Sequence, residues 1–221
     1  MTCRRQSTQS WRRADAPVTV PRRALLITAL ALLAPFGAAS AQAGLAPVTA
    51  ADRSVGRADA PVTIVEYASF ACHHCADWHQ FVYPVLKQRY IDTGQVRLVF
   101  RNMPTPPEEL SLPGASLARC AEPGRFFDVA SALFRGQPAA LNGGPREAWY
   151  APAIAVSGRT KAELEACATT PAVRAAINRD VESGQAAGAT TTPAFFVNGT
   201  RIRDRSLGGL EVAIRAAAAE R

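Results

Sequence analysis

Several features are scarce in this sequence, and their absence narrows the class of protein. Only 19% of the 221 residues are charged and 48% are hydrophobic, a globular composition that excludes a disordered or collagen-like chain. Residues 1–43 hold six arginines and one aspartate, which leaves 19 basic and 17 acidic residues in the rest. This near balance excludes the strongly basic surface of a nucleic-acid-binding protein. The sequence also has no internal repeats.

The sequence lacks an apolar run long enough to cross a membrane. The apolar segment 24–34 has 11 residues, whereas a membrane-spanning helix needs about 20. It follows the Arg22-Arg23 pair and precedes Ala41-Gln42-Ala43, an order typical of a cleaved secretory signal peptide. A membrane anchor is the alternative, and the arginine pair is compatible with twin-arginine export. We expect residues 1–43 to be removed and the mature chain to reside in the periplasm or cell envelope.

Cysteine is rare, and its count is informative in an oxidising compartment such as the periplasm. Cys3 lies within residues 1–43, so the mature chain would keep four cysteines: Cys72, Cys75, Cys120 and Cys167. An even number is what two disulfides require.

The hydrophobic pattern predicts an α/β fold. Residues 62–67 and 95–101 have the β-branched and alternating patterns of strands. Between them, residues 73–91 carry the apolar stripe of a helix, and Pro84 is expected to kink it. The stripe consists of Trp78, Phe81, Val82, Val85 and Leu86. A strand–helix–strand order predicts a mainly parallel pair of strands. Residues 44–60 show no periodicity and are expected to be a flexible or lightly docked lead-in.

The pattern changes to short helices from about residue 104 to residue 170, which predicts a helical insertion. Helices are expected at 114–121, 125–135, 146–156 and 161–168. Thr170-Pro171 then starts a further helix. Asn198-Gly199 between two apolar runs predicts a β-hairpin, and a last helix is expected over 207–220.

The segment Cys72-His73-His74-Cys75 lies where the first long strand meets the first helix. Backbone N–H groups and the helix dipole favour a thiolate at this position, and the two histidines add donors or partial positive charge. An ordinary thiol pKa of about 8.5 falls to ~3.5–7.5 in such places. A stabilised thiolate is a good leaving group, so its disulfide is oxidising. We therefore predict a redox-active pair in which Cys75 is the more enclosed partner.

Two segments of the sequence resemble a known family. Residues 65–75 and 188–199 resemble the active-site segments of the DsbA-like thiol–disulfide oxidoreductases, which have the thioredoxin fold. The resemblance implies a central mixed sheet flanked by helices with an inserted helical domain, one domain over residues 61–221. It also implies an oxidase that introduces disulfides into cysteine-containing exported proteins. A membrane or soluble redox partner would recycle it, and no cofactor or nucleic acid is implied.

The same resemblance assigns roles to individual residues. Pro193 would form a cis bond facing the disulfide, and Thr192 would offer its backbone to a substrate strand. Glu66 would be a buried carboxyl that shuttles protons for Cys75, with a solvated carboxylate at the strand end as the alternative. His73 and Thr192 depart from DsbA, and Thr192 is more similar to the isomerase-type relatives. A disulfide isomerase or reductase is therefore the second hypothesis.

Isomerases of this kind dimerise through an extra N-terminal domain. About 17 residues lie between residue 43 and the first long strand, too few to fold alone. A monomeric oxidase is the expectation.

A metal-binding module that delivers copper or zinc is the third hypothesis. The helical spacing places Cys72, Cys75 and His79 on one face, and these are the ligand types of zinc and copper. The sequence offers no second Cys/His cluster, so no metal is expected. His79 is then expected to be a surface or half-buried helix residue, with a residue that modulates the thiolate as the alternative.

Cys120 and Cys167 lie in two predicted helices of the insertion, 47 residues apart. Some members of the DsbA-like family carry a structural disulfide in this region, and two separate buried thiols are the alternative. A bond closing this loop would add roughly 3–4 kcal/mol of stability.

Overall fold

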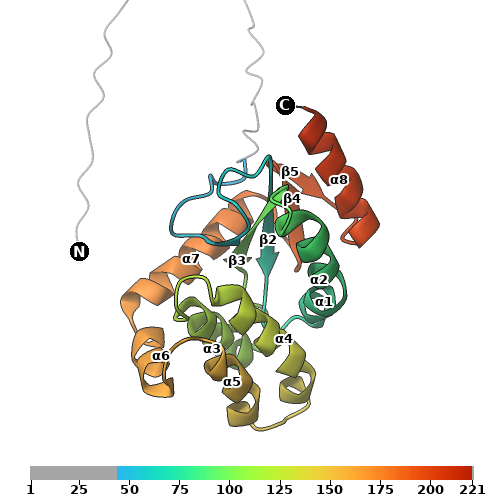
Figure 1. Ribbon diagram of the computed structural model, residues 1–221. Helices are drawn as coiled ribbons and strands as arrows, with labels where there is room; N and C mark the ends of the chain where they lie inside the picture. The colour runs from blue at the N-terminus through green and yellow to red at the C-terminus, as the bar shows by residue number, and fades with distance from the viewer. Residues whose placement is uncertain (1–43, 221) are drawn as a thin grey trace, which may run out of the picture. The chain divides into compact units, whose positions relative to one another are not determined.

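The computed structural model describes residues 44–220, so the signal-peptide prediction for residues 1–43 lies outside the described residues. None of the helices between residues 44 and 220 combines the length and apolar character needed to cross a bilayer. The elements follow one another as β1 (Arg53–Val55), β2 (Val62–Ala68), α1 (His73–Asp77), the π-helix η1 (Trp78–Val82), α2 (Tyr83–Leu86), the π-helix η2 (Lys87–Ile91), β3 (Val96–Asn102), α3 (Glu108–Arg119), α4 (Phe126–Leu141), α5 (Arg146–Ala155), α6 (Lys161–Ala168), α7 (Pro171–Ala186), β4 (Ala194–Val197), β5 (Thr200–Ile202) and α8 (Leu207–Ala219) (Figure 1).

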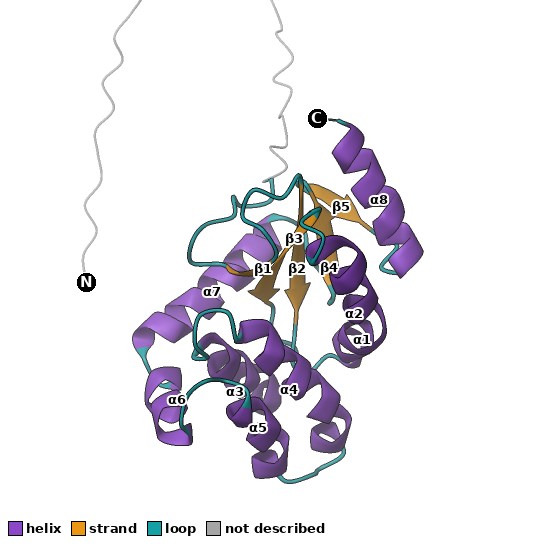
Figure 2. Ribbon diagram, viewed as in Figure 1, coloured by secondary structure: helices purple, strands orange, loops and turns teal. Residues whose placement is uncertain are grey.

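Five strands form one mixed sheet in the order β1-β3-β2-β4-β5 (Figure 2). β2 pairs parallel with β3, as the strand–helix–strand order predicts, and antiparallel with β4. The hairpin predicted at Asn198-Gly199 joins β4 and β5. Both turn residues have a positive φ, 44° and 87°, the backbone conformation that a two-residue hairpin turn requires.

Residues 44–60 are docked rather than flexible, and they contain a strand of the sheet that the sequence did not predict. β1 pairs antiparallel with β3. The preceding Asp52 accepts a 2.8 Å hydrogen bond from Nε of the buried Arg101, a residue of β3. Arg101 also donates to the carbonyl groups of Ala46 and Pro47, at 3.0 and 2.9 Å. These partners lie about 50 positions away in the chain, so periodicity within the lead-in could not reveal them.

Side chains of β2 alternate between two cores, because successive residues of a strand point to opposite faces. Val65 and Tyr67 belong to the smaller core, and the Tyr67 hydroxyl lies 2.9 Å from Ser183 Oγ of α7. Ile64 and Ala68 belong to the larger core. Figure 1 shows α7 on one side of the sheet and α1, α2 and α8 on the other. Glu66 shares the parity of Ile64 and Ala68 and therefore points into the larger core.

The helix predicted over residues 73–91 is present, but two π-helical turns interrupt it. In η1 the N–H of Tyr83 bonds to the carbonyl of Trp78, five residues back. Pro84 follows at the start of α2. A proline ring crowds the carbonyl four residues before it, and proline has no N–H group to donate to that carbonyl. The widened turn next to Pro84 therefore replaces the expected kink.

The helical insertion consists of α3 to α6, and it lies at one end of the sheet in Figure 1. α3 begins six residues before the predicted start, and α4 continues six residues past the predicted end. Pro113 and Pro138 lie inside these two helices. Buried residues such as Leu110 and Gln137 flank the prolines. Tertiary packing of these turns therefore compensates for the hydrogen bond that each proline removes.

Candidate active site

Cys72 is the N-cap of α1, at the point where the chain leaves β2 and enters the helix. Its backbone is extended, and its carbonyl accepts from the N–H groups of Cys75 and Ala76 at 3.1 and 3.2 Å. A turn at Ser69 connects the strand to this helix start, with the Ser69 hydroxyl accepting from the N–H of Ala71. The sulfur therefore lies beside the unpaired N–H groups of the first helical turn.

The two thiols of the motif have opposite environments. Both are free in the structure; Cys72 is half-buried, whereas Cys75 is 0% exposed. A hydrogen bond from Cys75 is the largest cause lowering the pKa of Cys72 from 9.0 to about 5, helped by Thr192 and the N–H groups of Cys75 and His74. Burial opposes this shift at Cys72, and at Cys75 burial raises the pKa well above its usual value. The pair thus combines an ionised, accessible sulfur with a neutral, enclosed one.

The side chains of His73 and His74 are exposed, and their rings lie 3.9 Å apart. His74 contributes to the lowered pKa of Cys72 through its backbone N–H. The tuning of the thiolate by the side chains of His73 and His74 stays a prediction.

The loop before β4 lies against Cys72, although 120 residues separate them. The Cys72 sulfur lies 3.4 Å from the carbonyl oxygen of Thr192, to which it can donate when it is protonated. The Thr192–Pro193 peptide bond is cis. β4 pairs antiparallel with β2, with Glu66 opposite Phe195. The residues before β4 are therefore held at the end of β2 from which the chain continues to Cys72.

Glu66 and His79 form a buried pair behind the thiols. Glu66 is 0% exposed, which agrees with the buried carboxyl that the resemblance implies. His79 Nε2 lies 3.1 and 3.0 Å from the two carboxylate oxygens. The expectation of a surface or half-buried His79 is wrong: the side chain is 3% exposed, and its ring stacks on Phe134 of α4 at 4.4 Å.

Gln137 of α4 is a site residue that the sequence analysis missed. Its Nε2 donates to the carbonyl groups of Phe70 and Cys72, at 2.7 and 3.0 Å. The helical insertion thereby holds the chain segment that leads into α1. The sequence does contain a signal for this residue: Gln137 is a polar side chain on the apolar stripe of α4 that includes Leu133 and Phe134.

A cleft of about 480 Å³ opens beside the thiol pair. Trp78, Phe81 and Pro193 line it, together with residues 203–206 of the chain segment before α8. Phe81 is 68% exposed. The cleft therefore offers a partly apolar surface next to the cis proline.

The metal hypothesis finds no matching geometry in the described part of the chain. No group of three or more His, Cys, Asp or Glu side chains there is arranged to hold a metal ion. Nε2 of His79 faces Glu66.

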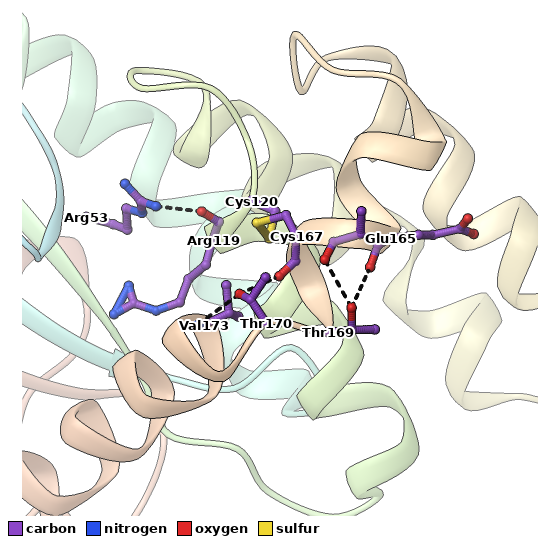
Figure 3. The surroundings of a disulfide bond; sticks show 9 residues. Arg53, Arg119, Cys120, Glu165, Cys167, Thr169, Thr170 and Val173 are labelled. Carbon is purple, nitrogen blue, oxygen red and sulfur yellow. Dashed lines mark hydrogen bonds between the residues drawn. A yellow bond between two sulfur atoms is a disulfide. The ribbon is translucent and has the colours of Figure 1, made fainter.

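Cys120 and Cys167 form a disulfide with an S–S distance of 2.07 Å (Figure 3). It joins the end of α3 to α6. Arg53 donates to the carbonyl of Arg119 beside it at 2.5 Å, which ties β1 to the same region. The bond lies within the insertion and stabilises its helices.

Comparison with known proteins agrees with this geometry. The family described as Thioredoxin matches residues 49–216. A Rickettsia prowazekii protein named as an inferred protein-disulfide oxidoreductase is 27% identical over 165 residues, which are 74% of this chain and 60% of that protein. The chain thus spans about three fifths of the length of the curated relatives it matches.

Two solved structures share the fold. Wolbachia pipientis alpha-DsbA1 has a TM-score of 0.69 at 25% identity, covering 80% of this chain and 94% of that one. Oxidised BdbD from Bacillus subtilis has a TM-score of 0.72 at 20% identity, covering 80% and 97%. The predicted thioredoxin fold with a helical insertion is confirmed. The chain belongs to the thioredoxin family and has the architecture of its DsbA-type proteins.

Proposed function

We propose that this protein is a thiol–disulfide oxidoreductase that oxidises dithiols in exported proteins through Cys72 and Cys75. The observation that carries the proposal is the Cys72 thiol, whose pKa is lowered to about 5 beside a buried Cys75. A thiol that prefers its ionised form is a good leaving group, which makes the corresponding disulfide oxidising. The names of the Rickettsia relative and the Wolbachia structure support the same class of activity.

The reaction begins with the Cys72–Cys75 disulfide. A substrate thiolate attacks the sulfur of Cys72, the S–S bond breaks, and Cys75 leaves as a thiolate that takes up a proton. The substrate's second thiolate then attacks the substrate's first sulfur, which is bonded to Cys72 in the mixed disulfide, and Cys72 leaves as a stable thiolate. The substrate loses two electrons and the cysteine pair gains them. An oxidising partner, membrane-bound or soluble, restores the disulfide.

Substrate binding is assigned to the loop at Thr192 and Pro193 and to the adjacent cleft. An extended peptide can pair with the backbone of this loop, as in other cases of strand addition. Phe81 and Trp78 supply apolar contacts beside it. This arrangement suits unfolded, cysteine-containing chains, whose apolar side chains are exposed. Residues 1–43 support action in the periplasm or cell envelope, and we expect a monomer.

The decisive experiment mixes the oxidised protein with a reduced peptide that contains two cysteines and follows formation of the peptide disulfide. Cys72→Ser is expected to abolish the reaction, because the attacked sulfur is missing. Cys75→Ser is the matched variant, and it is expected to trap a mixed disulfide between Cys72 and an oxidised thiol probe. Undiminished turnover by a folded Cys72→Ser protein would refute the assignment.

Disulfide isomerase or reductase activity is the second candidate. Thr192 before the cis proline favours it, since threonine there is similar to the isomerase-type relatives. Repair of a scrambled disulfide substrate distinguishes the two candidates. We expect rapid dithiol oxidation with little repair, and efficient repair by a dimer would reverse the order.

A further inference from the structure

Proton exchange at Cys75 requires a route through the protein, because the thiol is fully buried. Its sulfur takes up a proton when the disulfide opens and gives one up when the disulfide closes. The charge of Glu66 acts on Cys75, since it is one of the causes that raise the pKa of this thiol. Glu66 is itself 0% exposed. A further group must therefore connect this carboxyl to solvent.

His79 contacts Glu66 with one ring nitrogen and leaves the other unpaired. Nε2 lies 3.1 and 3.0 Å from the two carboxylate oxygens. Nδ1 is buried and has no hydrogen-bond partner among residues 44–220. An unpaired buried polar atom destabilises the fold, so its presence calls for a functional explanation.

The ring of His79 packs against aromatic neighbours. It stacks on Phe134 at 4.4 Å and meets Trp78 edge-on at 5.1 Å. The residue lies in η1, and single π-helical turns are frequent at functional sites.

His79 also forms part of the wall of a cleft of about 660 Å³ between the η1–α2 helix and α4. One water occupies about 30 Å³ of liquid, so the cleft has room for many. The other titratable groups around the ring or in the cleft are Tyr83, Lys87, Arg125, Asp128 and Arg135. Burial and the charge of Glu66 raise the pKa of Tyr83, which keeps its phenol neutral. Arg125 pairs with Asp128 at 3.3 Å, and Lys87 pairs with Asp92.

We propose that His79 is a positioning and proton-relay residue that connects this cleft, through Glu66, to Cys75. The inference rests on the proposed dithiol oxidation. When the disulfide opens, water in the cleft protonates Nδ1, the proton on Nε2 passes to Glu66, and the carboxyl protonates the Cys75 thiolate. When an oxidant closes the disulfide, the same proton returns: Cys75 gives it to Glu66, Glu66 to Nε2, and Nδ1 releases one to water. Each full cycle takes up one proton and releases one.

His79→Gln tests the relay, because a glutamine amide can donate to Glu66 but cannot carry a proton onward. The oxidised protein is mixed with excess dithiothreitol and acid-quenched, and the rate is corrected for the dithiothreitol thiolate at each pH. The wild-type rate is expected to decline with rising pH as the proton donor is depleted. We expect the variant to be at least about tenfold slower near pH 6 and to lose this decline, since general acid catalysis contributes about 10²–10⁴-fold. Gln80→Ala, in the same cleft but exposed, is the matched control and should keep the wild-type profile.

Two further measurements separate a relay from a merely structural role. His79→Ala leaves space beside the cleft, and added imidazole is expected to restore at least about a third of the lost rate. Glu66→Gln and the double variant Glu66→Gln/His79→Gln are expected to be equally slow, because residues on one path are not additive. The relay would be overturned if His79→Gln kept the wild-type pH profile. It would also be overturned if the variants were slow, imidazole did not restore the rate and the effects of the two substitutions added up.

The same assay distinguishes this inference from the proposed function. Wild-type protein that fails to oxidise a dithiol peptide contradicts the proposed function. Wild-type turnover combined with an unchanged His79→Gln profile contradicts the relay alone. The equilibrium of the cysteine pair with glutathione is expected to be the same within about threefold in wild type and His79→Gln, because a proton route alters rates rather than end states.

Discussion

The lowered pKa of Cys72 predicts that the reduced protein becomes more stable as pH rises. The thiol pKa is 9.0 in the unfolded chain and about 5 in the folded one. The folded state therefore holds the thiolate preferentially. This stabilisation is fully present above the unfolded pKa and is lost as pH falls through the folded pKa. The main cause is the hydrogen bond from Cys75, with help from Thr192 and the helix N–H groups against the opposing effect of burial.

One pKa unit corresponds to about 1.4 kcal/mol. At pH 5 half of the folded-state thiol is already ionised, so from pH 5 to pH 7 the unfolding free energy of the reduced protein should gain about 2.3 kcal/mol from Cys72 alone, a contribution that the disulfide form lacks. Urea unfolding of reduced wild type and reduced Cys72→Ser, from about pH 4 to about pH 7.5, measures it. Other titrating groups cancel in the difference between the two proteins, and a constant offset from the serine does not affect the slope. A difference that stays within about 0.5 kcal/mol over this range would refute a thiolate stabilised by its position.

Two further predictions concern the insertion. Gln137→Leu keeps the side-chain volume but removes the donor to the carbonyl of Phe70, whereas the carbonyl of Cys72 keeps the N–H groups of Cys75 and Ala76; urea unfolding should show a loss of about 1–2 kcal/mol, and unchanged stability would contradict the contact. Replacing Cys120 and Cys167 together by serine opens a 47-residue loop and should cost about 4 kcal/mol, measured by urea unfolding under oxidising conditions. The initial rate of dithiol oxidation by this double variant should stay within about twofold of wild type at 25 °C, because the bond includes no residue of the thiol pair; a folded variant that loses turnover would contradict a purely structural role.

Local signals predicted the parts of the fold that depend on a few neighbouring residues. The strand before Cys72, the helix that follows and the turn at Asn198-Gly199 each have their cause within about ten positions. The buried face of the helix over residues 73–91 was less predictable. Its apolar stripe includes Phe81, yet Phe81 is 68% exposed, and His79 and Tyr83 are buried in its place. A π-helical turn has more residues than an α-helical turn, so η1 shifts the face that meets the core, and no periodicity analysis with a fixed 3.6-residue repeat detects this.

The two sulfurs and the groups that surround them have different origins in the chain. Cys72 and Cys75 form a contiguous motif because one helix start must hold both. Glu66 reaches them by strand parity, Thr192 by antiparallel pairing of β4 with β2, and Gln137 from the inserted helix α4. Each of these contacts depends on strand pairing or helix packing between residues that lie far apart in the sequence. The motif alone therefore predicts the redox pair, whereas the contacts around it follow from the assembled sheet and insertion, and variants of these contacts should affect rates without removing the pair.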